Sequence, residues 1–262
     1  MRRTTLKVMS FNVRYDIGIF DRRQQKYPYM KWSFRKDRVA GQIRACMPDV
    51  LGAQELMPHQ RRFLKEALPE YGMAGRPRVL SVYGEGVYVF YRKDRFDLLE
   101  SEVFWLSPTP GRVSRGWDAS IPRIVTWTRL KDRQTHQVFS FAATHFDHKG
   151  RTARMESAKL VNAKMRAEKD PAILAGDFNL GPDTPCYPVL TNGLLDAGLA
   201  AAQNDGRLQT HNSFDDNRSF SMIDYILVTP QVEVGHYAVQ NKKVNGYFAS
   251  DHYAIVARLA FC

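Results

Sequence analysis

Two stretches of this sequence end an apolar run with polar side chains that could do chemistry. Residues 172–175 are apolar, Gly176 follows them, and Asp177 and Asn179 come directly afterwards. Residues 49–54 form a second short apolar run, and Glu55 stands at its end. A buried strand fixes the direction of the groups at its tip, so this pattern predicts polar groups aimed into a cleft. The alternatives are an Asx-turn at Asp177 and a helix N-terminal acid at Glu55.

Other polar residues occupy comparable positions at the ends of predicted strands. They are Asn12, Glu85, His145, Asp224, Asp251 and His252. Oxygen ligands of this kind suit Mg²⁺ or Mn²⁺, which take one or two carboxylates and keep several waters. A carboxylate that holds a histidine in one tautomer and favours its charged form makes it a better base or electrostatic clamp. Such groups suit phosphate ester hydrolysis, in which water is activated on one side and charge is stabilised on the other.

The elements that must position these groups follow from hydrophobic periodicity. Helical spacing predicts helices at residues 36–46, 59–68 and 152–168, and residues 14–35 are expected to form a loop. Alternating or apolar runs predict strands within residues 6–13, 49–54, 83–92, 97–106, 123–130, 137–148, 172–175, 221–228 and 247–261. Strands predominate, which indicates an α/β protein with two packed mixed or antiparallel sheets and helices outside. No linker divides the sequence, so residues 1–262 are expected to form one domain.

Composition limits the class of partner and the location. The 262 residues include 38 Lys and Arg against 27 Asp and Glu, giving a net charge of +11. This charge suits nucleic acid, a phosphorylated metabolite or a lipid headgroup, and a basic surface without such a partner is equally compatible. The 3 cysteines form no CxxC pair, which argues against a disulfide framework or a cysteine zinc site. Without a signal-like or membrane-length apolar run, we expect a cytoplasmic protein with no membrane span and no obligate protein partner.

Seven motifs in order carry a family resemblance: FNVRYD, GAQE, GEGVYVFYR, THFDH, GDFN, IDYI and SDH. Together they resemble the endonuclease/exonuclease/phosphatase superfamily, from residue 6 to about residue 259. The resemblance implies a four-layer α/β sandwich and metal-dependent phosphoesterase chemistry with Mg²⁺ or Mn²⁺. The stretches around residues 104–110, 116–130 and 144–154 look similar to a bacterial branch near the deadenylase-like members.

The resemblance also implies roles for individual residues. Glu55 matches the principal metal ligand, with Asn12 and Asp251 close to the metal. His252 matches the general base, and Asp224 orients it. Asp177 and Asn179 match the pair that positions the attacking water and binds the phosphate. His145 matches the second histidine, and Glu85 matches the acidic partner of that histidine.

Two arginines are expected at the substrate phosphate. Arg123 is a candidate phosphate clamp because guanidinium geometry fits phosphate oxygens. Arg14 is expected to bind the substrate phosphate as well. Arg14 stands where abasic-site endonucleases typically carry an acid, and His145 stands where they use a tyrosine. Both departures argue against a DNA-repair function.

Rival interpretations concern the histidines and tryptophans. The HFDH segment resembles the end of a metallo-β-lactamase zinc motif, but Ala143 replaces its first histidine. Among the tryptophans, Trp105 could stack on a base or sugar, Trp127 is expected in the core and Trp117 is the better stacking candidate. The remaining histidines are expected to be structural or on the surface, at His59, His136, His211 and His236.

Three function classes are compatible with these residues. The preferred one is a nuclease that cleaves phosphodiester bonds of RNA or DNA, favoured by the net charge of +11 and the deadenylase-like motifs. The second is a phosphatase or phosphodiesterase that acts on a small phosphorylated metabolite or lipid headgroup. The third, a binding protein that has lost catalysis, predicts missing catalytic groups, and none is missing.

Overall fold

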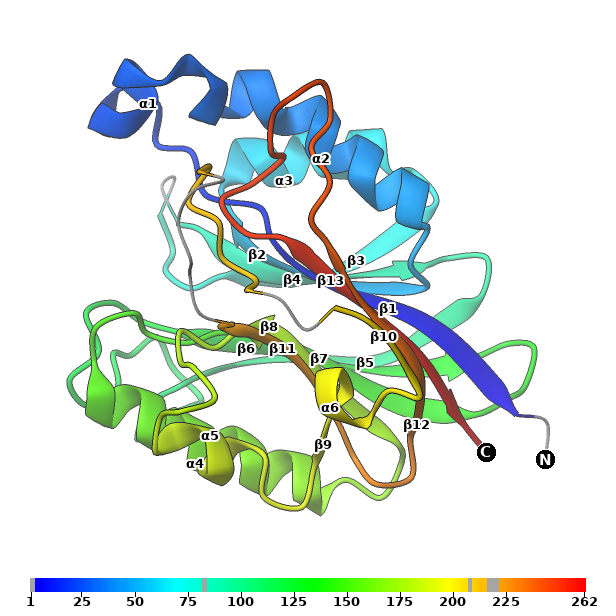
Figure 1. Cartoon of the computed structure of the whole chain (residues 1–262). Helices are drawn as coiled ribbons and strands as arrows, with labels where there is room; N and C mark the ends of the chain where they lie inside the picture. Colours follow the sequence, from blue (N-terminus) through cyan, green and yellow to red (C-terminus); the bar gives the residue numbers. More distant parts are fainter. Residues whose placement is uncertain (1–2, 82–83, 207–208, 216–221) are drawn as a thin grey trace.

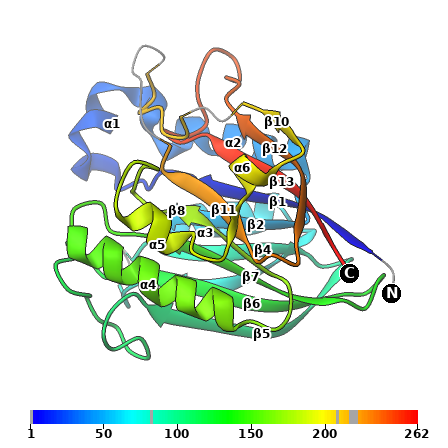
Figure 2. The same ribbon diagram turned by 60° about the horizontal axis from the view of Figure 1, so that its bottom comes forward.

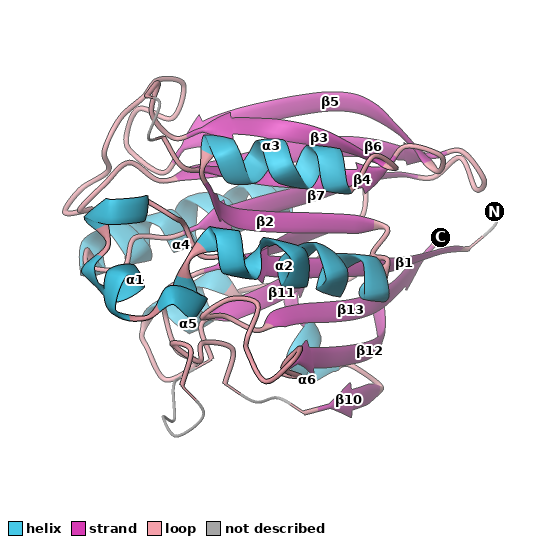
Figure 3. Cartoon of the chain, turned by 90° about the horizontal axis from the view of Figure 1, so that it is seen from above, coloured by secondary structure: helices cyan, strands magenta, loops and turns pink. Residues whose placement is uncertain are grey.

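Two β-sheets packed face to face form the centre of the molecule (Figure 1). The computed structural model describes residues 3–81, 84–206, 209–215 and 222–262. Helices α2 (Trp32–Cys46) and α3 (Pro58–Ala67) cover the outer face of one sheet, as Figure 3 shows from above. Helices α4 (Arg151–Ala167) and α5 (Cys186–Leu190) lie on the outside of the other sheet in Figure 2. This arrangement confirms the predicted four-layer α/β sandwich.

The first sheet has seven strands among the described residues and mixes parallel with antiparallel pairs. Its order is β10 (Gln203–Asp205), β12 (Glu233–Gln240), β13 (Ala254–Phe261), β1 (Thr4–Asn12), β2 (Val50–Leu56), β4 (Gly86–Arg92) and β3 (Tyr71–Pro77). β1 and β2 run parallel with Asn12 opposite Gln54, while β13 runs antiparallel to β1. The last residues of β1 and β2 therefore lie at the same end of the sheet as the residues just before β13.

The second sheet has six strands among the described residues. Its order is β5 (Phe96–Trp105), β6 (Ile124–Asp132), β7 (Val138–His145), β8 (Ala172–Asp177), β11 (Asp224–Val228) and β9 (Leu195–Asp196). The register sets His145 opposite Asp177 in the parallel β7–β8 pair, and Asp224 opposite Asp177 in the antiparallel β8–β11 pair. Three predicted site residues are thus neighbours at one end of this sheet.

The main hydrophobic core lies between the sheets because each sheet turns a row of apolar side chains inward. Val8 and Val50 of the first sheet and Phe141 and Leu174 of the second are completely buried in this core. A second cluster fills the space under α2 and α3. At Gly176 the chain passes so close to β7 that a Cβ atom would collide with the carbonyl of Thr144, which explains the glycine before Asp177.

Most predicted elements are present, and the main correction concerns residues 14–35. This segment is not one loop, because it contains η1 (Gly18–Phe20), α1 (Arg22–Lys26) and η2 (Pro28–Met30), and α2 begins at Trp32 rather than at residue 36. The Asp21 carboxylate caps α1 by accepting hydrogen bonds from the backbone N–H groups of Arg23 and Gln24. Residues 83 and 221, which begin two predicted strands, lie outside the described residues.

Several short elements were not expected from the sequence: β9, β10, β12, α5 and α6 (Ala197–Ala200). Four of them are only two to five residues long, too short to show periodicity. In the part of the chain that the structure describes, no helix is long and apolar enough to cross a membrane.

Candidate active site

The polar strand ends from both sheets surround a cleft of about 540 Å³. Nine of the predicted site residues line it: Arg14, Glu55, Glu85, Arg123, His145, Asp177, Asn179, Asp251 and His252. Asn12 and Asp224 stand behind this lining and are hydrogen-bonded to it. A groove of similar volume, about 530 Å³, lies at the opposite ends of the strands, around Arg3, Lys7 and Arg95, and contains none of the predicted site residues.

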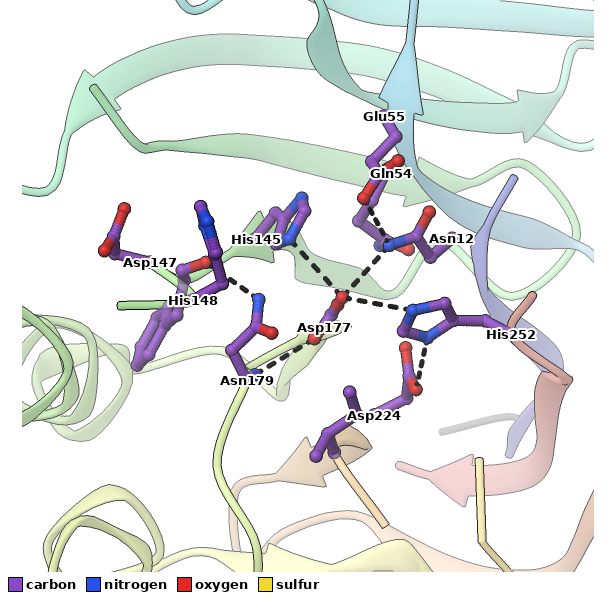
Figure 4. Close-up of polar contacts among 12 residues, drawn as sticks. Asn12, Gln54, Glu55, His145, Asp147, His148, Asp177, Asn179, Asp224 and His252 are labelled. Carbon is purple, nitrogen blue, oxygen red and sulfur yellow. Dashed lines mark hydrogen bonds and ion pairs between the residues drawn. The ribbon is translucent and has the colours of Figure 1, made fainter. Parts of the chain in front are cut away.

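Asp177 lies at the centre of a group of polar residues, the Asp177 cluster, which Figure 4 shows. Its other members are Asn12, His145, Asn179 and His252. The Oδ2 atom of Asp177 accepts a hydrogen bond from Asn12 Nδ2 at 3.0 Å and lies 3.3 Å from His145 Nε2 and 3.7 Å from His252 Nε2. Its Oδ1 atom accepts the backbone N–H of Asn179 at 3.0 Å. The site is therefore more than an Asx-turn, because side chains of both sheets converge on one carboxylate.

The protonation of His252 depends on two carboxylates. Its Nδ1 atom lies 2.9 Å from Asp224 Oδ2, with both side chains buried. Burial alone would lower the pKa of His252, but the charges of Asp224 and Asp177 outweigh it and raise the pKa to about 10. Burial and the Asp224 charge raise the pKa of Asp177 above the usual range of a carboxyl group. This combination favours a charged His252 beside an Asp177 that holds a proton more readily than ordinary carboxylates do.

His145 differs from His252 in its electrostatic surroundings. Burial and the neighbouring positive charge of Arg123 hold its pKa well below the ordinary value, so the neutral ring is favoured. Glu85, its expected acidic partner, instead forms ion pairs with Arg78 and Arg123 among the described residues. The carboxylate that lies beside His145 is Asp177.

Glu55 is the carboxylate best suited to a divalent cation. Its backbone has φ of +65°, at an irregularity in the β2–β4 pairing between Ala53 and Leu56, and its side chain lines the cleft. Its two oxygens accept hydrogen bonds from Asn12 Nδ2 at 3.1 Å and from the backbone N–H of Tyr15 at 2.8 Å. No Lys, Arg or His of the described residues pairs with Glu55 within 4.0 Å, although the residue is only 8% exposed. A nearly buried carboxylate without a cationic partner fits Mg²⁺ or Mn²⁺.

Asn12 presents nitrogen rather than oxygen to this site. Its Oδ1 atom accepts the backbone N–H of Arg14 at 3.0 Å, so its amide nitrogen points to Glu55 and Asp177. This orientation lets Asn12 hold the two carboxylates together. Its expected role as a metal ligand stays a prediction.

Arg14 and Asp251 face each other across the cleft wall. Arg14 Nε lies 3.6 Å from Asp251 Oδ2, and Arg14 Nη2 lies 3.5 Å from Asp21 Oδ2. Ser250 Oγ lies 3.3 Å from Asp251 Oδ1 and donates to the carbonyl of Asn12 at 2.7 Å. These contacts fix Asp251 beside the end of β1.

A buried arginine absent from the sequence predictions holds these segments in place. Arg35 of α2 is 0% exposed, and its guanidinium donates hydrogen bonds of 2.8–3.0 Å to four backbone carbonyls. The acceptors belong to Val13, Arg14, Met30 and Ala249. Arg35 thus joins the segment after β1 to the segment that leads to Asp251 and His252. A sequence offers no signal for this role, because the acceptors are backbone atoms and three of the four lie at least 21 residues away in the chain.

The cleft lining also contains three residues that the sequence analysis did not place in the site. Arg78, His148 and His211 all line the cleft. Arg123 Nε lies 3.6 Å from Asp147 Oδ2, and Arg123 Nη2 lies 3.1 Å from His148 Nδ1. The ring of His211, expected to be structural or on the surface, lies 4.7 Å from the ring of His252 between centroids, with the two ring planes tilted by 55°.

The zinc and stacking alternatives receive little support. Within the described ranges, the group of His, Cys, Asp and Glu side chains with ligand-like spacing is Asp177, Asp224 and His252, with atoms within 4.8 Å of one another. His145 and His148 do not belong to it. Trp127 is buried, as expected, and so is Trp105; Trp117 is half-buried and does not line the cleft.

Comparison with known proteins decides the family. A sequence model of the Endonuclease/Exonuclease/phosphatase family matches residues 9–252. This chain belongs to the endonuclease/exonuclease/phosphatase family. Members of this family are phosphoric ester hydrolases that generally use divalent metals, and the chain is accordingly such a hydrolase.

Two solved structures from Bacteroides thetaiotaomicron are similar over the whole length. An endonuclease/exonuclease/phosphatase family protein is 35% identical with a TM-score of 0.92, covering 100% of this chain and 96% of that one. A mannosyl-6-phosphatase is also 35% identical with a TM-score of 0.89, covering 97% of this chain and 99% of that one. Nocturnin of Drosophila melanogaster is 27% identical over 190 residues, which are 66% of this chain and 28% of nocturnin.

Proposed function

We propose that this protein is a divalent-metal-dependent phosphomonoesterase that hydrolyses a small phosphorylated sugar. The observation that carries the proposal is the Asp177 cluster inside a cleft of about 540 Å³, a volume typical of small-ligand sites. Similarity over the whole chain to a mannosyl-6-phosphatase supports a sugar as the alcohol part of the substrate. This reverses the preference for a nuclease that the sequence alone suggested.

The cleft lacks two features that a polymer-binding groove usually has. Among the described residues that line it, Tyr15 is the only Phe, Tyr or Trp, so it offers no row of stacking platforms. Its arginines are matched by carboxylates, since Arg14 pairs with Asp251 and both Arg78 and Arg123 pair with Glu85. A cleft with balanced charge favours one phosphate group over an extended polyanion.

The proposed mechanism divides the work between Asp177 and His252. The phosphate binds against both side chains, with Asn179 and Arg123 as further contacts. Asp177, whose pKa is raised by burial and by Asp224, takes a proton from the attacking water. His252, kept charged by Asp224 and Asp177, stabilises the negative charge that develops on the phosphoryl oxygens. His252 thus acts as the electrostatic clamp rather than as the base implied by the resemblance.

Glu55 would hold the metal, with Asp251 as the next candidate ligand. The bound metal supplies charge neutralisation at a phosphoryl oxygen. Asn12 keeps the Glu55 and Asp177 carboxylates in one geometry through its amide nitrogen. This shared hydrogen-bond partner supports the proposal that Glu55 and Asp177 act together on the metal and the water.

A nuclease is the second candidate, because the net charge of +11 and the exposed basic residues of α1 are specific observations in its favour. These residues are Arg22, Arg23 and Lys26, and they follow Asp21, which pairs with the cleft residue Arg14. A strand of nucleic acid that left the cleft at this side would meet them.

One assay separates the two candidates. Hydrolysis with Mg²⁺ or Mn²⁺ is measured on mannose 6-phosphate, phenyl phosphate, single-stranded RNA, and single- and double-stranded DNA, each with a chelator control. We expect chelator-sensitive turnover of the phosphomonoesters and a loss of about 10²-fold or more in Asp177→Asn. Cleavage of polymers alone would overturn the proposal and establish the nuclease.

A further inference from the structure

His148 is an exposed residue at the rim of the cleft, on the turn between β7 and α4. It lines the cleft together with Ile121, Arg123 and Asn179. Figure 4 shows its ring beside Asn179, on the far side of Asp177 from His252. The mechanism above gives His148 no role.

The contact with Arg123 fixes which ring nitrogen of His148 carries a hydrogen. Arg123 Nη2 lies 3.1 Å from His148 Nδ1. A guanidinium has only donors, so Nδ1 must be the acceptor in this pair. Burial and the Arg123 charge also lower the pKa of His148, which favours the neutral ring. The single ring hydrogen is then on Nε2.

The ring cannot easily turn away, because its partners are themselves fixed. Arg123 is 4% exposed and lies 3.9 Å from Glu85 and 3.6 Å from Asp147. Asp147 accepts hydrogen bonds from Ser120 Oγ at 2.8 Å and from the backbone N–H groups of residues 149 and 150. His148 thus presents a preoriented N–H donor, whose Nε2 atom has no hydrogen-bond partner among the described residues.

The geometry points to His148 as a specificity-determining residue, whose Nε2–H donates to a hydroxyl oxygen on the alcohol part of the substrate. The inner cleft, with Asp177, His145 and His252, is taken by the phosphate and the attacking water. A donor on the exposed rim therefore meets the group that carries the phosphate. A neutral N–H group suits a neutral hydroxyl, which a phosphorylated sugar has and an aryl phosphate lacks. This inference rests on the proposed function of the same site.

The test compares two substrates and three substitutions. Mannose 6-phosphate carries hydroxyl groups, whereas phenyl phosphate has none on its ring. We expect His148→Ala to lower kcat/KM for mannose 6-phosphate by about three- to tenfold, mainly through KM, the effect of one neutral hydrogen bond. Turnover of phenyl phosphate should stay within about twofold. His148→Gln, whose amide nitrogen lies near the position of Nε2, should retain more activity on mannose 6-phosphate than His148→Asn, whose amide nitrogen reaches only the position of Nδ1.

Two controls keep the outcomes apart. His236→Ala removes a histidine of β12 outside the cleft lining and should change neither substrate, and thermal unfolding of each variant checks its fold. Equal losses on both substrates would show that His148 acts through Arg123 rather than on a hydroxyl, and no loss on either would also overturn the inference. If the wild-type protein hydrolyses neither phosphomonoester, the proposed function itself fails, and this inference fails with it.

Discussion

One oxygen of Asp177 has three side-chain neighbours, and this concentration explains its electrostatics. Asn12 donates to it, while His145 and His252 lie within 3.7 Å. The carboxyl group is 2% exposed, so these contacts replace water almost completely. A residue with so many partners cannot be changed without disturbing each of them.

Removing the charge of Glu55 tests the metal assignment. Glu55→Gln should raise the Mg²⁺ concentration for half-maximal activity by at least about tenfold, because an amide is a weaker ligand than a carboxylate. A metal titration of the activity measures this. Glu66→Gln, the same change on the exposed side of α3, is the matched control and should leave the titration unchanged. If Glu55→Gln also leaves it unchanged, the ligand role moves to Asp251.

The pKa of His252 predicts a pH-dependent contribution to stability. Its pKa is raised from 6.5 to about 10 in the folded chain, so folding favours the protonated ring. The contribution is therefore complete below pH 6.5 and is lost as the pH rises through 10. Urea unfolding with chelator present, from pH 6 to about 10, should show a difference between the wild-type protein and His252→Gln that shrinks with rising pH. A difference that stays constant over this range would contradict the assignment of the His252–Asp224 pair.

The side chains at strand ends could be found from the sequence, whereas those that support them could not. Asp177 and Glu55 follow apolar runs, so periodicity and residue type together indicated them. His211 and Arg78 enter the cleft through tertiary packing of loops and edge segments, and no local pattern marks them. The pairing of Glu85 with arginines rather than with His145 likewise depends on distances between elements that spacing does not give.

At the scale of elements, strand register brings the site together. His145 and Asp224 flank Asp177 because β7 and β11 are its two neighbours in the second sheet. The first sheet contributes Asn12 from β1 and Glu55 from β2, so the two sheets must pack in one relative position for the contacts to form. The strands that carry these residues were predictable. The short helices α1 and η2 within residues 14–35 were not, because α1 depends on the Asp21 cap and η2 on Pro28 rather than on periodicity.

Arg35 supports a prediction at this scale. Arg35→Lys leaves some of its four carbonyl acceptors unpaired, so we expect destabilisation by about 1–3 kcal/mol. We also expect kcat/KM to fall about ten- to a hundredfold, since the segments that carry Arg14 and His252 shift. Enzyme kinetics and urea unfolding measure the two effects.

Arg95 offers the matched control for Arg35. It pairs with Asp49 and Asp132 and donates to the carbonyl of Thr5, in the groove at the opposite end of the strands. Arg95→Lys should cost stability without changing kcat/KM. Equal kinetic losses in both variants would show that Arg35 has a general structural role and no positioning role in the cleft.

At the scale of the whole molecule, the net charge of +11 is compatible with a surface that binds polyanions. For the proposed phosphomonoesterase, KM for mannose 6-phosphate should change less than about threefold between about 50 and 200 mM salt, because one phosphate engages few cations. Steady-state kinetics at constant free Mg²⁺ measures this. A fall in affinity of several orders of magnitude for a polymer substrate would support the nuclease instead.

The pairing of the first and last strands has a practical consequence. Thr4 of β1 lies opposite Phe261 of β13, so the beginning of β1 and the end of β13 lie side by side at one end of these strands (Figure 1). At the opposite ends of the same two strands, Asn12 ends β1 and the cleft residue His252 precedes β13. A tag, a surface tether or a fused partner attached at either terminus would thus extend away from the catalytic face. The same proximity makes the protein suited to circular permutation, with a short peptide joining the old ends and new ends opened in a distant surface loop.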